Sequence, residues 1–291
     1  METNRISKIV HQALLERKLN DFYCTSETCK GWERNVVTQP LTVNKIVSAG
    51  AERISAGIGV GHELTDHELA RMIDHTLLKP DATIDEIKTL CSEAKQFEFA
   101  SVCINPCHVK LCSDLLRGTR VKVCTVIGFP LGSNPTAVKR AEAEQAISEG
   151  AQELDMVLNV GWLKSKMYRE VFDDIQQIVI PAKNRRVIVK VILETCLLTD
   201  EEIVKASLIC KQAGASYVKT STGFSKSGAT VQAVALMKKV VGSTLGVKAS
   251  GGIRTTEDAR AMVESGADRI GASASVKIVT GGGSGSGTGS Y

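Results

Sequence analysis

Three lysines recur at equal intervals of 29 residues inside β-rich apolar runs, and this spacing constrains the fold more than any other feature. They are Lys190 in VIVKVILET, Lys219 in YVKTSTG and Lys248 in GVKASGGIR. The interval fits one strand, one helix and their connections, so we expect the three lysines on neighbouring parallel strands. Like-charge repulsion there should lower the pKa of at least one of them. Because a neutral lysine amine attacks carbonyl carbons, the spacing predicts an enzyme.

The alternation of strand-like and helical patterns extends from about Leu69 to Lys277. The apolar runs are ARMIDHT, FASVCINP, VKVCTVIGFP, ELDMVLN, VIVKVILET, YVKTST, LGVKASGGI and DRIGASAS. Eight strands alternating with helices predict an α/β fold, the closed (β/α)8 TIM barrel. The alternative is an open doubly wound sheet, which needs a glycine-rich phosphate turn after its first strand. Leu77-Leu78-Lys79-Pro80 stands there instead, which favours the barrel.

Local signals support two of the expected helices and three of the turns. Thr83 with Glu86, and Thr199 with Glu202, have the spacing of a capping box, in which each side chain satisfies a backbone N–H of the other. Glycines that suit a helix end turning back into the sheet precede three strands, at Gly150, Gly214 and Gly266.

The chain divides into three parts. Residues 1–64 stand outside the repeat and predict an N-terminal helical extension with a linker. Residues 65–280 form the predicted barrel, which we expect to be the catalytic domain. Residues 281–291 read GGGSGSGTGSY, a flexible Gly/Ser tail that ends in Tyr291.

Composition excludes several classes of function. The net charge of +4 is small and its cations are scattered among acids, so we expect no nucleic-acid partner. We read the densest basic cluster, at 183–186, as a solvated loop. No apolar run is long enough to cross a bilayer, which predicts no membrane contact. We also expect no secretory signal, and nine cysteines without one indicate a reduced cytoplasmic protein.

Neither the cysteines nor the histidines have a metal-binding spacing. His75 ends the first strand-like run without a second histidine or a carboxylate cluster nearby. We therefore expect no metal and no cofactor, and a zinc-dependent aldolase mechanism is disfavoured.

Strand alternation sorts the polar side chains onto one face. Asp155, Lys190, Lys219 and Lys248 have the parity opposite to their apolar neighbours, so they should converge inside the barrel toward its carboxyl-terminal end. A buried salt-bridge network with a structural role is the alternative, but one Asp and three Lys leave positive charge unpaired.

Glycine-rich segments follow the last strands, where barrels of this kind bind phosphate with backbone N–H groups. They predict a phosphate-binding set consisting of Gly223, Gly251, Gly252, Gly271 and Ser273.

The motifs MIDHTLLKP, VCINP, GFPLG, ELDMVLN, VKVILET, VKTSTGFS, VKASGGIR and RIGASAS carry a family resemblance. From about Asp66 to Ser275, together with the tail, the chain closely resembles the deoxyribose-phosphate aldolases, which are class I Schiff-base aldolases. The resemblance implies reversible cleavage of 2-deoxy-D-ribose 5-phosphate into D-glyceraldehyde 3-phosphate and acetaldehyde, without a cofactor. It also implies a homo-oligomer, a dimer or a tetramer.

The same resemblance implies a role for each site residue. Lys219 is the Schiff-base nucleophile, and Lys248 keeps part of its amine neutral. Asp155 transfers a proton at the hydroxyl next to the bond that breaks, through a water that Lys190 and Asp74 help to orient. Tyr291 reaches the site and helps to protonate the enamine.

One position departs from the family pattern, and two other functions stay open. Phe224 stands where some members carry a lysine near the substrate phosphate. A class I aldolase for another sugar phosphate is one alternative function. A non-catalytic barrel that binds a phosphate ligand is the other.

Overall fold

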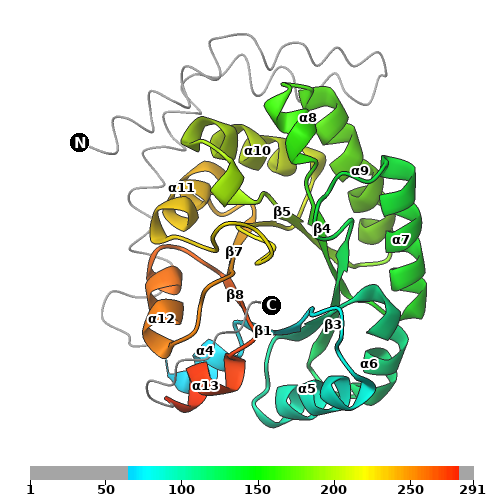
Figure 1. Ribbon diagram of the computed structural model, residues 1–291, viewed down its shortest axis with the longest axis vertical. Helices are drawn as coiled ribbons and strands as arrows, with labels where there is room; N and C mark the ends of the chain where they lie inside the picture. Colours follow the sequence, from blue (N-terminus) through cyan, green and yellow to red (C-terminus); the bar gives the residue numbers. More distant parts are fainter. Residues whose placement is uncertain (1–64, 282–291) are drawn as a thin grey trace.

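Eight parallel strands follow one another around the barrel in chain order, and β8 closes the ring by pairing with β1. This computed structural model describes residues 65–281 (Figure 1). The strands are β1 (Ile73–Leu77), β2 (Ser101–Ile104), β3 (Lys122–Ile127), β4 (Glu153–Val157), β5 (Ile188–Ile192), β6 (Tyr217–Lys219), β7 (Gly246–Ser250) and β8 (Arg269–Ala272). The predicted (β/α)8 TIM barrel is confirmed. Seven strands fall within one apolar run each, and β1 extends one residue beyond its run, to Leu77.

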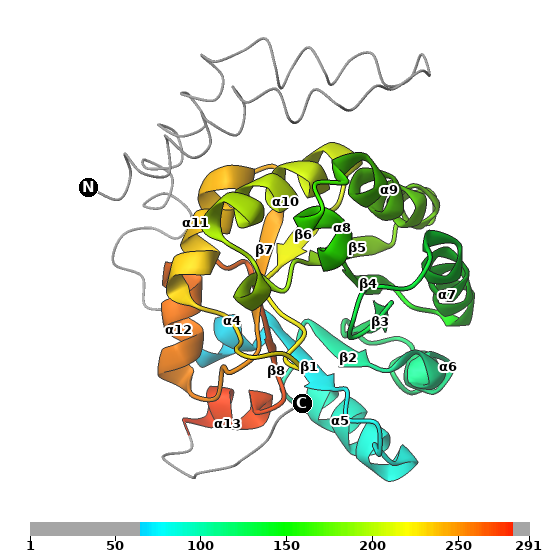
Figure 2. The same cartoon turned by 45° about the horizontal axis from the view of Figure 1, so that its top comes forward.

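Helices surround the strands on the outside of the barrel (Figure 2). They are α4 (Asp66–Ala70), α5 (Ile84–Gln96), α6 (Val109–Leu115), α7 (Thr136–Glu149), α8 (Val160–Lys164), α9 (Tyr168–Asn184), α10 (Asp200–Ala213), α11 (Val231–Val241), α12 (Thr256–Glu264) and α13 (Ser275–Thr280), with 3-10 turns η2 (Pro106–His108) and η3 (Thr195–Leu197). Outward-facing strand residues such as Leu154, Val191 and Val247 are fully buried against them. This apolar layer between strands and helices is the main core.

The expected capping and turn signals are present. Thr83 caps α5 and Thr199 caps α10, each in a capping box with the glutamate three residues on. Gly150, Gly214 and Gly266 have φ of +110°, +82° and +105°, a left-handed conformation that favours glycine. These residues therefore set where the helices begin and end.

The barrel interior has two unlike halves. On the side of β1 to β3, an apolar wall is formed by Leu78, Cys103, Cys124 and Val126. On β4 to β8, and at Asp74 of β1, inward positions carry acids and lysines that are also buried. The interior thus brings charged groups together beside a low-polarity surface, where electrostatic interactions are strong.

Two predicted segments lie outside the described residues, namely the N-terminal extension (1–64) and all of the tail beyond Gly281, including Tyr291. Within residues 65–281, no helix has the length and apolar character needed to cross a membrane. The basic cluster at 183–186 is exposed at the end of α9, as expected for solvated residues.

Candidate active site

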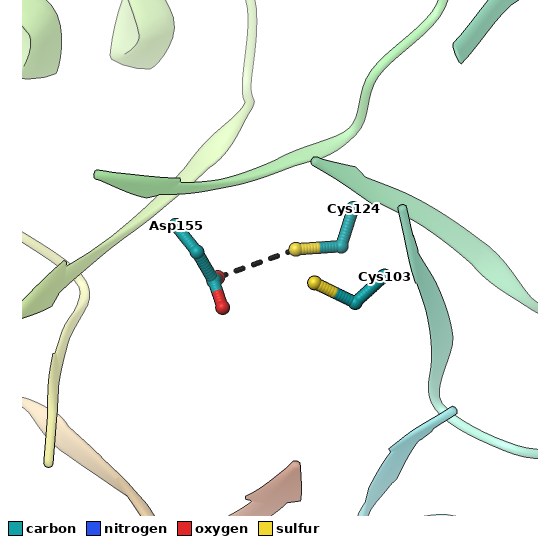
Figure 3. Close-up of side chains that lie close together, drawn as sticks. All are labelled: Cys103, Cys124 and Asp155. Carbon is teal, nitrogen blue, oxygen red and sulfur yellow. Dashed lines mark hydrogen bonds between the residues drawn. The ribbon is translucent and has the colours of Figure 1, made fainter. Parts of the chain in front are cut away.

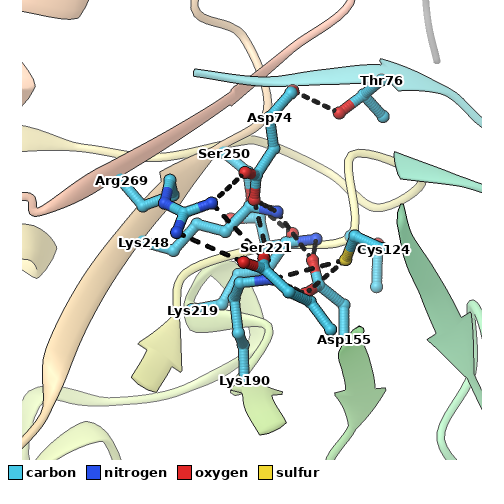
Figure 4. A network of polar contacts seen from close by, with 12 residues as sticks. Asp74, Thr76, Cys124, Asp155, Lys190, Lys219, Ser221, Lys248, Ser250 and Arg269 are labelled. Carbon is cyan, nitrogen blue, oxygen red and sulfur yellow. Dashed lines mark hydrogen bonds and ion pairs between the residues drawn. The ribbon is translucent and has the colours of Figure 1, made fainter. Parts of the chain in front are cut away.

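Asp155 on β4 lies at the centre of the polar half of the barrel (Figure 4). Its Oδ1 lies 2.9 Å from Nζ of Lys190, and its Oδ2 lies 2.8 Å from Nζ of both Lys219 and Lys248. All four side chains are buried, with Lys219 the most exposed at 3%. The structure therefore brings together the acid and the three lysines that strand parity placed on one face.

Strand register explains this convergence. Asp155 is level with Lys190 on the neighbouring strand, and Lys219 is level with Lys248. Neighbouring strands lie about 4.8 Å apart, so level side chains of one face are in contact. Gly271 on β8 also contributes, because a Cβ there would lie 3.0 Å from Cε of Lys248. The glycine predicted to bind phosphate thus lies inside the barrel and leaves room for this lysine.

Two further acids complete the network. Asp74 on β1 contacts Lys248 (Oδ2–Nζ, 2.5 Å) and accepts a hydrogen bond from Ser101 Oγ at 2.7 Å. Glu153 lies on β4 two residues before Asp155, on the same face of the strand. Its Oε2 lies 2.6 Å from Nζ of Lys190. Arg269 on β8 bridges the two acids, at 2.6 Å from Asp74 and 3.3 Å from Glu153.

The acids are held in their ionised form. Burial disfavours the carboxylate of Asp155, but the attraction of Lys190, Lys219 and Lys248 outweighs burial and holds the pKa of Asp155 well below its usual range. Burial likewise opposes ionisation of Asp74, and the attraction of Lys248 and Arg269 prevails, so the pKa of Asp74 is lowered. Both groups are therefore proton acceptors at neutral pH.

Two of the three lysines are held in their charged form. Burial disfavours the ammonium of Lys190, but attraction by Asp155, Glu153 and Asp74 raises its pKa well above the usual value. Burial and attraction oppose each other at Lys248 as well, and Asp155 and Asp74 raise its pKa. The sequence predicted that clustering would lower the pKa of at least one of the three lysines. The pKa of Lys190 and that of Lys248 are raised instead, because the sequence argument did not include Asp74 and Glu153 as neighbours.

The network contains one more basic side chain than acidic side chains. The basic side chains are those of Lys190, Lys219, Lys248 and Arg269, and the acids are Asp74, Glu153 and Asp155. Three of the four basic groups therefore suffice to balance the three carboxylates.

The predicted phosphate-binding residues other than Gly271 lie where strands end. Gly223 follows β6, Gly251 and Gly252 follow β7, and Ser273 follows β8. The loop after β6 and the loop after β7 are close together, since a Cβ on Gly251 would lie 3.6 Å from Cα of Gly223. Their role in phosphate binding stays a prediction.

Cys103 and Cys124 bring two thiols close to Asp155 (Figure 3). Cys124 Sγ lies 3.2 Å from Oδ1 of Asp155 and 3.3 Å from Nζ of Lys190. The three ligand atoms lie within 4.8 Å of one another, a geometry compatible with a soft metal ion. However, both oxygens of Asp155 already accept from lysines, and a divalent cation here would face the charges of Lys190, Lys248 and Arg269. Burial raises the pKa of Cys124, which further favours the thiol over a thiolate ligand.

His75 has no part in the site. Its side chain leaves β1 on the outer face, where Nε2 lies 2.7 Å from Glu93 of α5 and the ring packs at 5.0 Å from Phe99. The parity of the strand explains this, because Asp74 next to it faces inward.

Sequence reasoning missed Glu153, Arg269 and Cys124. Glu153 shares the inward parity of Asp155, and Arg269 shares that of Gly271. Applying parity to the first residues of β4 and β8 would have found these two. Parity does not predict which side chains these residues contact, since Arg269 and its partner Asp74 are 195 residues apart in the sequence.

Fold and site together define a class of protein. A parallel barrel with buried lysines around a carboxylate, at the carboxyl ends of its strands, is the architecture of a class I aldolase.

Comparison with known proteins identifies the family. Residues 68–289 match the model of the DeoC/LacD family of aldolases, and the chain belongs to this family. The chain is 60% identical over 212 residues to the deoxyribose-phosphate aldolase of Caldanaerobacter subterraneus subsp. tengcongensis, covering 72% of this chain and 92% of the relative. It is also 60% identical over 216 residues to that of Lysinibacillus sphaericus, covering 74% and 96%. A tetrameric deoxyribose phosphate aldolase structure from Aeropyrum pernix is 36% identical, with a TM-score of 0.71 and coverage of 81% and 96%.

Proposed function

We propose that this chain is a class I aldolase that reversibly cleaves 2-deoxy-D-ribose 5-phosphate into D-glyceraldehyde 3-phosphate and acetaldehyde. The carrying observation is the carboxylate of Asp155 between the amines of Lys219 and Lys248, 2.8 Å from each. The names and the identity of its relatives support the substrate.

The first step joins the substrate to Lys219. Its neutral amine attacks the C1 aldehyde of the open-chain sugar, and loss of water from the carbinolamine leaves an iminium. Lys248 stays protonated beside it, because its pKa is raised, and can donate to the departing hydroxyl.

The second step breaks the C2–C3 bond. A base removes the proton of the C3 hydroxyl, the C3–O bond becomes a carbonyl, and the electrons of the C2–C3 bond pass to the iminium to give an enamine. Asp155 is the base in this proposal, acting through a water, since it is ionised and within hydrogen-bond distance of Lys219. D-glyceraldehyde 3-phosphate leaves at this point.

The third step returns a proton to C2 of the enamine, and water then releases acetaldehyde and regenerates Lys219. We assign this protonation to Tyr291, which lies outside the described residues. We assign the phosphate to Gly223, Gly251, Gly252 and Ser273 at the ends of β6 to β8, with Gly271 beneath them.

Two further properties complete the proposal. A homo-oligomer, a dimer or tetramer, is supported by the tetrameric relative from Aeropyrum pernix. A cytoplasmic location is supported by the seven free cysteines of the described chain, which suit a reducing compartment.

Reductive trapping tests the mechanism. Wild type incubated with acetaldehyde and borohydride should gain a two-carbon adduct by intact mass, and Lys219→Ala should gain none. Lys277→Ala, which removes a lysine of α13 outside the network, is the control and should be trapped like wild type. An adduct on Lys219→Ala would contradict the choice of lysine, and no adduct on wild type would favour a non-catalytic binder.

A further inference from the structure

Glu194, the second residue after β5, is a buried carboxylate that the mechanism does not use. It is only 4% exposed, and no lysine or arginine of the described chain forms an ion pair with it. A buried carboxylate without a cation is costly unless hydrogen bonds satisfy it. The burial of Glu194 without a cationic partner therefore indicates that a carboxylate is specifically required at this position.

The backbone of Glu194 is also strained. Its φ of +56° and ψ of +60° lie in the left-handed region, which costs a residue with a Cβ about 1 kcal/mol or more. Such a conformation persists where the surroundings fix it, and it is common at functional sites. Here it aims the carboxylate at the loop that follows β6.

The contacts of Glu194 organise that loop. Thr222 donates to the carboxylate from its backbone N, at 3.3 Å to each oxygen, and from its hydroxyl. The same hydroxyl oxygen accepts a hydrogen bond from the backbone N of Phe224 at 3.1 Å. The carboxylate thus fixes the residues on both sides of Gly223, whose φ is +88°. Cys196 adds a weaker link, with Sγ 3.8 Å from Glu194 and 3.4 Å from Ser225.

The far end of this loop is held by the β7 loop. Ala229 N lies 3.0 Å from the carbonyl oxygens of both Ser250 and Gly251. Gly228 permits this approach, because a Cβ there would lie 2.0 Å from the Gly251 oxygen. The segment from Thr222 to Ala229 is therefore anchored at one end by Glu194 and at the other by the backbone of β7.

We infer that Glu194 is a positioning residue for substrate phosphate: by holding Thr222, it fixes the turn at Gly223 against the turn at Gly251. The inference rests on the proposed function and names its specificity element. Glu194 does not touch the phosphate. It accepts from Thr222, so that the turn holds the N–H of Gly223 in one arrangement, and this lowers the entropic cost of binding the anion.

The test compares a phosphorylated with an unphosphorylated substrate. In Glu194→Gln the amide NH2 replaces one acceptor oxygen and meets the Thr222 donors unfavourably. We expect kcat/KM for 2-deoxyribose 5-phosphate to fall about tenfold, the effect of one charge-assisted hydrogen bond. For 2-deoxyribose itself, kcat/KM should change less than about twofold, since no phosphate uses the turn.

Two sets of variants control this experiment. Glu142→Gln is the matched control, because Glu142 is a half-buried glutamate that accepts from Gly128 N at 2.7 Å in the loop after β3. It should leave the ratio of the two substrates unchanged. Thr222→Val should reproduce the loss of phosphate preference and Thr222→Ser should retain the preference, and these variants decide the question if Glu194→Gln does not fold.

The outcomes separate the two hypotheses. If wild type cleaves both substrates and neither Glu194→Gln nor Thr222→Val lowers the preference for phosphate, the role of Glu194 is wrong. An equal loss for both substrates would make it a general structural residue and would also overturn the inference. If wild type cleaves neither substrate and forms no adduct with acetaldehyde, the proposed function itself fails, whatever Glu194 does.

Discussion

Three lysine side chains share a single carboxylate in this barrel, so we assign two functions to Asp155. It balances part of the charge of Lys190, Lys219 and Lys248, and it accepts protons during the proposed reaction. These functions respond differently to substitution, because charge balance affects folding and proton transfer affects turnover.

Replacing Asp155 should therefore change both quantities. Asp155→Asn keeps the shape but leaves buried lysines without their central anion. We expect kcat to fall roughly 10²- to 10⁴-fold through loss of the base. We also expect the free energy of unfolding to fall by about 3 kcal/mol, the cost of breaking a buried ion pair.

Steady-state cleavage and urea denaturation measure these two effects. The control is Asp173→Asn, which breaks a half-exposed pair with Arg169 on α9 and should cost less than about 1 kcal/mol. Full activity in Asp155→Asn would exclude this residue as the base.

At the scale of single residues, the sequence predicted that Asp155, Lys190, Lys219 and Lys248 face the barrel interior, because alternation along a strand is a local property. It did not predict the pairing of Glu194 with Thr222. That contact joins two loops through a left-handed residue, and neither propensity nor spacing marks a glutamate for such a conformation.

Between neighbouring elements, a glycine on one strand makes room for an aromatic ring on the next. Gly246 on β7 is level with Tyr217 on β6, and a Cβ on Gly246 would lie 2.1 Å from that ring. The ring in turn packs 5.8 Å from the guanidinium of Arg269, which bridges Asp74 and Glu153. Tyr217, Gly246 and Arg269, which form the floor of the polar half, thus come from three consecutive strands, β6, β7 and β8.

Gly246→Ala should disturb this floor. The added methyl group has to displace Tyr217, which we expect to lower the free energy of unfolding by about 1–3 kcal/mol. Thermal denaturation measures the change. Gly161→Ala on α8 is the matched control, because its Cβ would meet only Asn159, at 3.4 Å, and an unaltered melting temperature for both variants would contradict the packing argument.

Elements were the most predictable level of this structure. The sequence alone reveals the capping boxes at Thr83 and Thr199 and the glycines that end helices, because these signals depend only on residues a few positions apart. The room that Gly246 leaves for Tyr217 was not predictable, because it depends on a register between strands 29 residues apart.

For the whole molecule, the ionised network ties stability to pH. Asp155 and Asp74 have lowered pKa values in the folded state, since the attraction of buried cations outweighs the effect of burial. Such groups contribute stability that is complete above their unfolded pKa, about 3.9, and that is lost as pH falls through the folded value. Lys190 and Lys248 have raised pKa values, so their contribution is complete below about pH 10.4 and is lost only as pH rises through the folded values.

The stability difference between wild type and Asp155→Asn should follow this rule. We expect it to be constant from about pH 5 to about pH 10 and to shrink as pH falls below about 4. Urea midpoints measured across this range give the difference directly. A difference that changes most between pH 6 and 8 would mean that a histidine or another group governs the network.

The apolar wall has a consequence for altering substrate range. Leu78 and Val126 fill one side of the interior, whereas the ionised groups extend from β4 round to β1. Shortening either side chain adds space inside the barrel, at the cost of a small cavity, and removes no charge. Adjustable volume and fixed chemistry therefore reside on different side chains, so a library confined to Leu78 and Val126 could search for larger aldehyde acceptors while every variant keeps the ionised network, including Asp74 on β1.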